Sequence, residues 1–122
     1  MALQEDIDIG DYAFNKGKAL QQVTLPSITK LGTGAFQGCI NLAKVQLEEG
    51  LDIIGHYAFK NCQALQEVTI PSSVTKLGCG AFGGCNDLAE VHSKEGSLQV
   101  VGAAAFCNCS SLQSVTIPST VT

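Results

Sequence analysis

The sequence predicts a repeat solenoid, in which short turns of chain stack with a parallel β-sheet on the concave side and short helical or 3-10 turns opposite. Three observations predict it. The dipeptide Ala-Phe occurs five times in 122 residues, at steps of 22, 23, 23 and 24. A Leu always follows the Phe by six residues, and a Val follows it by nine. Self-similarity at a fixed period of this length is typical of repeat architectures, so we expect a single domain of stacked turns.

Equivalent positions form columns through the five turns, whose approximate limits are 7–28, 29–51, 52–74, 75–98 and 99–122. The aromatic column consists of Phe14, Phe36, Phe59, Phe82 and Phe106. Four residues before each Phe is a Gly: Gly10, Gly32, Gly55, Gly78 and Gly102. Three residues after it, four turns have a Cys and the first has Gly17: Cys39, Cys62, Cys85 and Cys109.

Each turn divides into two predicted elements. The segment Leu-x-x-Val-x-Ile ends in alternation, the pattern of a half-buried strand, and its copies are expected to pair about 4.8 Å apart. The segment Gly-x-x-Ala-Phe-x-x-Cys spaces apolar residues three or four apart, which predicts a short helical turn. The Phe is expected to form an aromatic spine, and the Gly to allow a backbone angle that other residues resist. Pro26, Pro71 and Pro118 are expected to end strands.

A second period of two turns is superposed on the first. Turns one, three and five share Val-Thr-(Leu or Ile)-Pro-Ser, whereas turns two and four carry acidic inserts at Glu49-Gly50 and Glu95-Gly96. Tyr12 and Tyr57 precede Ala-Phe in turns one and three. The repeating unit is therefore a pair of turns.

The repeat resembles the BspA-like class of leucine-rich repeats, which includes bacterial and protist surface proteins. The resemblance covers about residues 7–122 and is clearest at residues 54–62 (IGHYAFKNC) and 65–72 (LQEVTIPS). It implies a solenoid of the leucine-rich-repeat type and a binding or adhesive module that presents its sheet to a protein or glycan. It also points to the cell surface.

The Cys column is interpreted as structural. Equivalent side chains point the same way, so they do not converge as a disulfide or a tetrahedral metal site requires. We expect small buried residues whose thiols donate weakly to the turn backbone. Cys79 and Cys107 lie outside the column, where a disulfide and a reactive surface thiol are the disfavoured alternatives. No metal or other cofactor is predicted.

No catalytic constellation is evident. His56 and His92 fall in different turns and columns, which excludes a recognisable His/Cys/Asp triad. The glycines at 78, 80, 83 and 84 lack the Lys-Ser/Thr of a phosphate-binding loop. We therefore predict that the chain is not an enzyme.

Charge and hydropathy exclude two classes of partner. The formal net charge is -4, and the seven basic residues are scattered, so nucleic acid is not an expected partner. No apolar run approaches the roughly 20 residues that span a bilayer, which argues against direct membrane insertion. The acidic N-terminus shows no secretory signal. Localisation stays open, because the resemblance points to the surface while a column of thiols suggests reducing conditions.

The best functional candidates are two outward columns of the expected sheet, which form a polar, slightly acidic stripe. The first column is Gln22, Lys44, Glu67, Glu90 and Ser114, and the second is Thr24, Gln46, Thr69, His92 and Thr116. The stripe lacks the Trp, Tyr and Arg that dominate binding hot spots. A solvated surface is therefore the equal alternative to a binding face.

The ends of the solenoid suggest an alternative function. The final residues, 119–122, stop before the Lys-Leu-Gly of a further turn, and no polar cap is recognisable. An uncapped solenoid exposes apolar surface and strand edges. We therefore expect either a fragment of a longer protein or a structural subunit whose ends are covered by neighbouring subunits.

Overall fold

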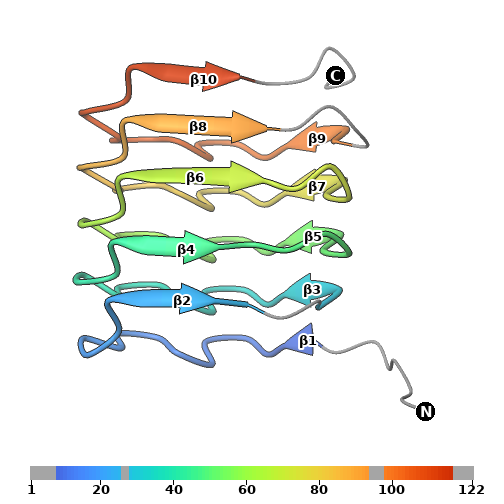
Figure 1. Ribbon diagram of the computed structural model, residues 1–122, viewed down its shortest axis with the longest axis horizontal. Helices are drawn as coiled ribbons and strands as arrows, with labels where there is room; N and C mark the ends of the chain where they lie inside the picture. Colours follow the sequence, from blue (N-terminus) through green and yellow to red (C-terminus); the bar gives the residue numbers. More distant parts are fainter. Residues whose placement is uncertain (1–7, 26–27, 94–97, 117–122) are drawn as a thin grey trace.

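Ten short strands stack in two rows in the computed structural model, which describes residues 8–25, 28–93 and 98–116, the last three and Asp8 through their backbone only (Figure 1). The front row holds the predicted strands: β2 (Gln22–Thr24), β4 (Lys44–Gln46), β6 (Glu67–Ile70), β8 (Glu90–Ser93) and β10 (Ser114–Thr116). The back row holds β1 (Asp8–Ile9), β3 (Lys30–Leu31), β5 (Ile53–Ile54), β7 (Lys76–Leu77) and β9 (Val100–Val101). All strand pairings among the described residues are parallel, as a solenoid requires.

The front row confirms the predicted columns and differs from the expected single sheet. Val23 pairs with Val45, and Val68 with Val91, so equivalent positions are in register. The row is nevertheless divided into a two-stranded sheet, β2-β4, and a three-stranded sheet, β6-β8-β10. The interruption between β4 and β6 is visible as the widest interval of the row (Figure 1).

The back row is a continuous five-stranded sheet that the sequence pattern does not predict. Its strands contain only two residues each, and the second of them is the aliphatic residue that precedes the Gly four residues before each Phe. A strand of two residues is too short to show alternation, which is the usual signal of a strand.

The expected helical turns are wrong for the described residues, which contain no helix. Instead, successive backbone amides donate alternately to a carbonyl in the next turn and to a carbonyl three residues earlier in the same turn. In turn three, the amide of Phe59 donates to Ala81 in the next turn at 2.7 Å, and that of Lys60 donates to Tyr57 at 3.1 Å. Tyr57 and Asn61 have φ angles of 58° and 63°, in the left-handed region that no α-helix contains. The segment is therefore a series of tight turns that also pairs with its neighbour.

The column of Gly four residues before Phe has a different cause from the one expected. A Cβ on Gly78 would lie 2.5 Å from the amide nitrogen of His56 in the preceding turn, and one on Gly55 would lie 2.6 Å from the carbonyl of Leu31. Neither Gly has a positive φ. These glycines are required because successive turns approach too closely for a side chain.

Positive φ angles occur two residues before and after the Phe, and they explain the double period. The position two residues before Phe is Tyr57 in turn three and Gly80 in turn four. A Cβ on Gly80 would meet the ring of Tyr57 at 2.7 Å. The ring of an odd turn thus covers the Gly of the next turn, and Tyr12 covers Gly34 in the same way.

The aromatic spine is confirmed. Consecutive Phe rings are stacked, with centroids 5.1, 5.4, 5.2 and 5.7 Å apart from Phe14 to Phe106. The three inner rings are fully buried, whereas Phe14 is 45% exposed. Burial of one such side chain contributes on the order of 1.5–3 kcal/mol.

The acidic insert of turn two ties it to turn three. The carboxylate of Glu49 accepts hydrogen bonds from the amide and the hydroxyl of Ser72, at 3.1 and 2.9 Å. Pro71 follows directly after the last residue of β6, as predicted. Pro26, Pro118, Glu95 and Gly96 lie outside the described residues. The described part contains no helix of the length and apolarity needed to cross a membrane.

Candidate partner-binding face

The outward columns of the front row are exposed, as predicted. Along β4, β6 and β8 the pattern alternates, with outward residues exposed and inward Val residues buried. The exposed members are Gln22, Thr24, Lys44, Gln46, Glu67, Thr69, Glu90 and His92. The backbone of β10 places Ser114 opposite Glu90 and Thr116 opposite His92, while their side chains lie outside the described part.

The strand register brings some of these residues together and separates others. Glu67 and Glu90 are direct partners on β6 and β8, and Thr69 is the partner of His92. Gln22 and Lys44 are partners on β2 and β4. Because β4 and β6 do not pair, the stripe consists of two patches with an opening between them.

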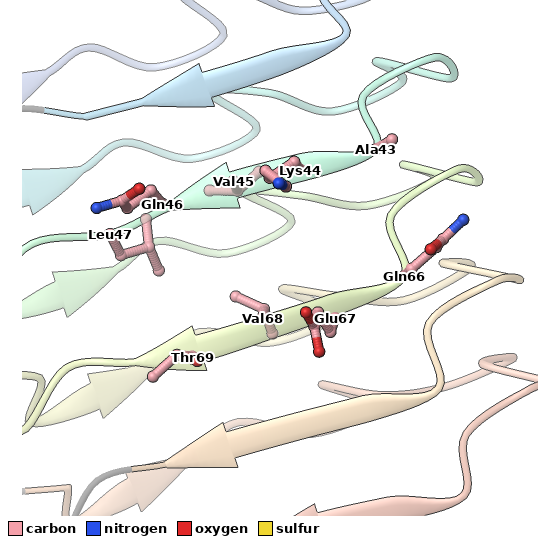
Figure 2. Close-up of a pocket in the computed structure, with 9 residues that line it drawn as sticks. All are labelled: Ala43, Lys44, Val45, Gln46, Leu47, Gln66, Glu67, Val68 and Thr69. Atoms are coloured by element: carbon pink, nitrogen blue, oxygen red, sulfur yellow. The ribbon is translucent and has the colours of Figure 1, made fainter.

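The opening is a cleft of about 340 Å³ between β4 and β6. Figure 2 shows the side chains that line it, along the two facing strands: Ala43, Lys44, Val45, Gln46, Leu47, Gln66, Glu67, Val68 and Thr69. The amide of Ala43 donates to Gln21 and that of Ala89 donates to Gln66, but no equivalent bond joins Gln66 to Ala43 among the described residues. The strand edges at the cleft therefore present unpaired backbone groups.

The cleft is restricted to the front of the solenoid. At the same level of the stack, the amide of Gly55 donates to Leu31 at 2.9 Å, and that of Phe36 donates to Ala58 at 2.8 Å. Turns two and three are thus hydrogen-bonded on the back and along the row of tight turns. Lys44 and Glu67 place opposite charges on the two sides of the front opening.

Sequence reasoning identified four of the lining residues as outward positions and missed the cleft itself. Ala43 and Gln66, seven residues after their Phe, precede the strands and line its end. The column pattern is the same between turns two and three as between other turns. Residue identities in that pattern therefore give no signal of the missing pairing.

The Cys column confirms the predicted structural role. The thiol of Cys85 donates to the carbonyl of Phe59 at 3.2 Å, and Cys39 and Cys62 make the equivalent bond to Phe14 and Phe36. Burial raises the pKa of Cys85 to about 12 and that of Cys62 further. Because the thiolate is the nucleophile and the metal ligand, these protonated thiols are poor candidates for either chemistry.

The remaining chemical groups lie apart. His56 accepts a hydrogen bond at Nδ1 from the amide of Cys79 at 2.9 Å, next to the row of tight turns. His92 contacts Glu90 on the front face, with 3.3 Å between Nε2 and Oε1. Cys79 and Cys107 are free thiols.

Comparison with known proteins identifies a family and several solved structures that share this architecture. Residues 7–122 match the BspA type leucine rich repeat region in six copies, where the Ala-Phe pattern predicts five turns. A leucine-rich repeat protein of T. pallidum is 26% identical over 93% of this chain and 64% of its own, with a TM-score of 0.73. A leucine rich cell surface protein of Faecalibacterium prausnitzii is 23% identical over 93% of this chain and 45% of its own, with a TM-score of 0.70, and supports the fold alone.

A third solved structure shares more of the sequence. A leucine-rich repeat protein of Bacteroides capillosus is 34% identical over 72% of this chain and 63% of its own, with a TM-score of 0.63. The chain thus spans less than two thirds of the length of these solved relatives. No curated protein matched it. Leucine-rich repeats are generally protein-binding modules without catalytic activity. The chain belongs to the family of BspA-type leucine-rich repeat proteins.

Proposed function

We propose that this chain is a non-catalytic module that binds a protein partner on its front face, with the cleft between β4 and β6 at the centre of contact. The observation that carries the proposal is the position of the cleft. It interrupts the exposed stripe between Lys44 and Glu67, while hydrogen bonds close the same interval elsewhere around the turn.

The chemistry of the cleft favours a polypeptide over an apolar ligand. Unpaired amides and carbonyls of strand edges are the groups that an extended peptide uses in recognition. Lys44 and Glu67 add one charge of each sign, which favours a partner that presents both signs. A glycan remains the second ligand class for the same face.

The test first isolates a protein partner by its binding to the unmodified chain. That partner is then titrated into the unmodified chain and into each variant, and the dissociation constants are compared. Lys44→Glu reverses one flanking charge, and Thr69→Arg places a long side chain at the cleft. Both variants should bind that partner about tenfold more weakly, because one places a like charge and the other a long, charged side chain at the proposed centre of contact. Lys76→Glu on β7 makes the same charge change on the back sheet and should bind normally. Equal binding by all three variants would remove the front face from consideration.

The alternative function, a structural subunit docked through the ends, is supported by an apolar pocket at the first turn. This pocket of about 300 Å³ is lined by Ile9, Phe14, Leu20, Val23, Thr24, Leu25 and Phe36. Phe14→Asp would abolish such docking and leave front-face binding intact. Sedimentation measures the association state of the chain. Association that is lost in Phe14→Asp supports docking through the ends, and an unchanged association state supports the front face. Val121, near the other end, lies outside the described residues.

A further inference from the structure

We propose that Glu67, Glu90 and His92 form a surface site for a divalent transition-metal ion of the zinc class. One ligand atom from each of the three side chains lies within 4.8 Å of the others. No sequence motif indicates the site, because its ligands come from two turns and are joined only by the strand register. It goes beyond the proposed binding function and does not depend on it.

The pairing of β6 with β8 places the two carboxylates side by side. Glu67 and Glu90 are direct register partners on the same outward face. Like charges opposite each other on paired strands are destabilising. Among the described residues, Glu90 forms an ion pair with His92, and no Lys or Arg lies within 4.0 Å of the carboxylate of Glu67 or Glu90. A bound cation would relieve this repulsion.

His92 supplies the ligand that distinguishes the site from an ordinary pair of surface acids. Its Nε2 lies 3.3 Å from Oε1 of Glu90, and the two side chains are 50% and 49% exposed. Imidazole nitrogen with carboxylate oxygen is a set that suits zinc, nickel and copper. Calcium and magnesium prefer six or more oxygen ligands, so the imidazole disfavours them.

The geometry requires a small adjustment only. Zinc bonds of about 2.0–2.1 Å place neighbouring ligands roughly 3.3 Å apart in a tetrahedron. The ligand atoms already lie within 4.8 Å of one another, and rotation of the exposed Glu67 and His92 side chains can bring them closer while the paired strands keep the backbone positions fixed. Three protein ligands leave a fourth position for water.

The test is calorimetric titration of the whole folded chain with zinc chloride near pH 7, with no partner present. One ion should bind per chain. Glu67→Gln, Glu90→Gln and His92→Asn should each weaken binding at least about tenfold, the lower limit seen even when groups that only orient a ligand are removed. Asp87→Asn, which neutralises an exposed acid elsewhere, should have no effect.

The exposed thiol of Cys107 is the main competing site, so Cys107→Ser is titrated in parallel. In addition, zinc should shift the ring NMR signals of His92 and leave those of His56 unchanged. The proposal is overturned if zinc fails to bind, if binding persists in His92→Asn, or if it disappears in Cys107→Ser. Since the titration uses no partner, its failure leaves the proposed function standing, and loss of partner binding leaves the metal site standing.

Discussion

The thiol of Cys62 donates a hydrogen bond to the backbone carbonyl of Phe36 in the preceding turn, with 3.2 Å between sulfur and oxygen. Cys109 makes the same bond to Phe82 at 3.1 Å. The Cys column therefore connects each turn to the spine residue of its neighbour.

The inner rings of the spine should contribute more to stability than the outer ones. Phe59 is fully buried between two rings, so Phe59→Ala should lower the free energy of unfolding by about 3–5 kcal/mol or prevent folding. Phe14→Ala removes the same atoms from a residue that is 45% exposed and should cost much less. Urea unfolding of both variants measures the difference. Equal losses would contradict a spine whose centre is at Phe59.

Because successive turns approach closely at Gly78 but not at Gly10, substitution by Ala should change the stability of the chain at the first of these glycines and not at the second. Gly78→Ala would place a Cβ 2.5 Å from backbone of the preceding turn and should destabilise the chain by about 1–3 kcal/mol. Gly10 has no atom within 4 Å of an added Cβ, and Gly10→Ala should be close to neutral. Thermal unfolding compares the pair. Similar melting temperatures for the two variants would show that the turns are not in contact at Gly78.

Buried thiols should make the fold sensitive to alkali. Burial raises the pKa of Cys85 from its ordinary value of 9.0 to about 12. The unfolded chain therefore loses this proton near pH 9 while the folded chain retains it. The associated stability is complete below pH 9 and is lost between about 9 and 12, at roughly 1.4 kcal/mol per pH unit.

Unfolding free energies measured between pH 7 and 11 check this dependence. Cys85→Ser should reduce the alkaline slope, whereas Cys107→Ser, which removes an exposed thiol, should not. A slope that is the same in both variants and the unmodified chain would contradict a buried, protonated Cys85.

Ser93 is the weak position of the inward columns. It occupies the place of Leu25, Leu47 and Ile70, and its buried hydroxyl has no partner among the described residues. A buried hydroxyl without a hydrogen bond costs about 1–3 kcal/mol, so Ser93→Val should stabilise the chain by about 1 kcal/mol. The exposed Thr24→Val serves as the control in thermal unfolding. A lower melting temperature for Ser93→Val would show that the hydroxyl is needed.

The repeated positions of the sequence predict which side chains are buried in the core. Phe59, Cys62 and Val68 are buried, as their recurrence predicts. An apolar residue that recurs along the stack is shielded from water by packing against the equivalent residues of neighbouring turns. The outward positions follow from alternation along the strand, which explains why Glu67 and His92 are exposed as expected.

Features that depend on backbone geometry are less visible in the sequence. An apolar spacing of three or four residues suits both a helical turn and these tight turns, so the sequence pattern predicts a helix where the structure has none. The signal that separates the two is the recurrence of Gly or Asn at positions such as Gly80, Gly84 and Asn61, where φ is positive. The cleft between β4 and β6 has no such signal. The grouping of Glu67, Glu90 and His92 depends on register between turns, which residue identities alone do not specify.

Contact between consecutive Phe rings tests the stacking of turns most directly. The chain has five Phe residues, so ring-to-ring nuclear Overhauser effects can be assigned in a Phe-labelled sample. Strong effects are expected for Phe36–Phe59 and Phe59–Phe82, whose centroids are 5.4 and 5.2 Å apart, and none for Phe36–Phe82. Absence of the effect between Phe59 and either neighbour, in the folded chain, would contradict the stacked solenoid.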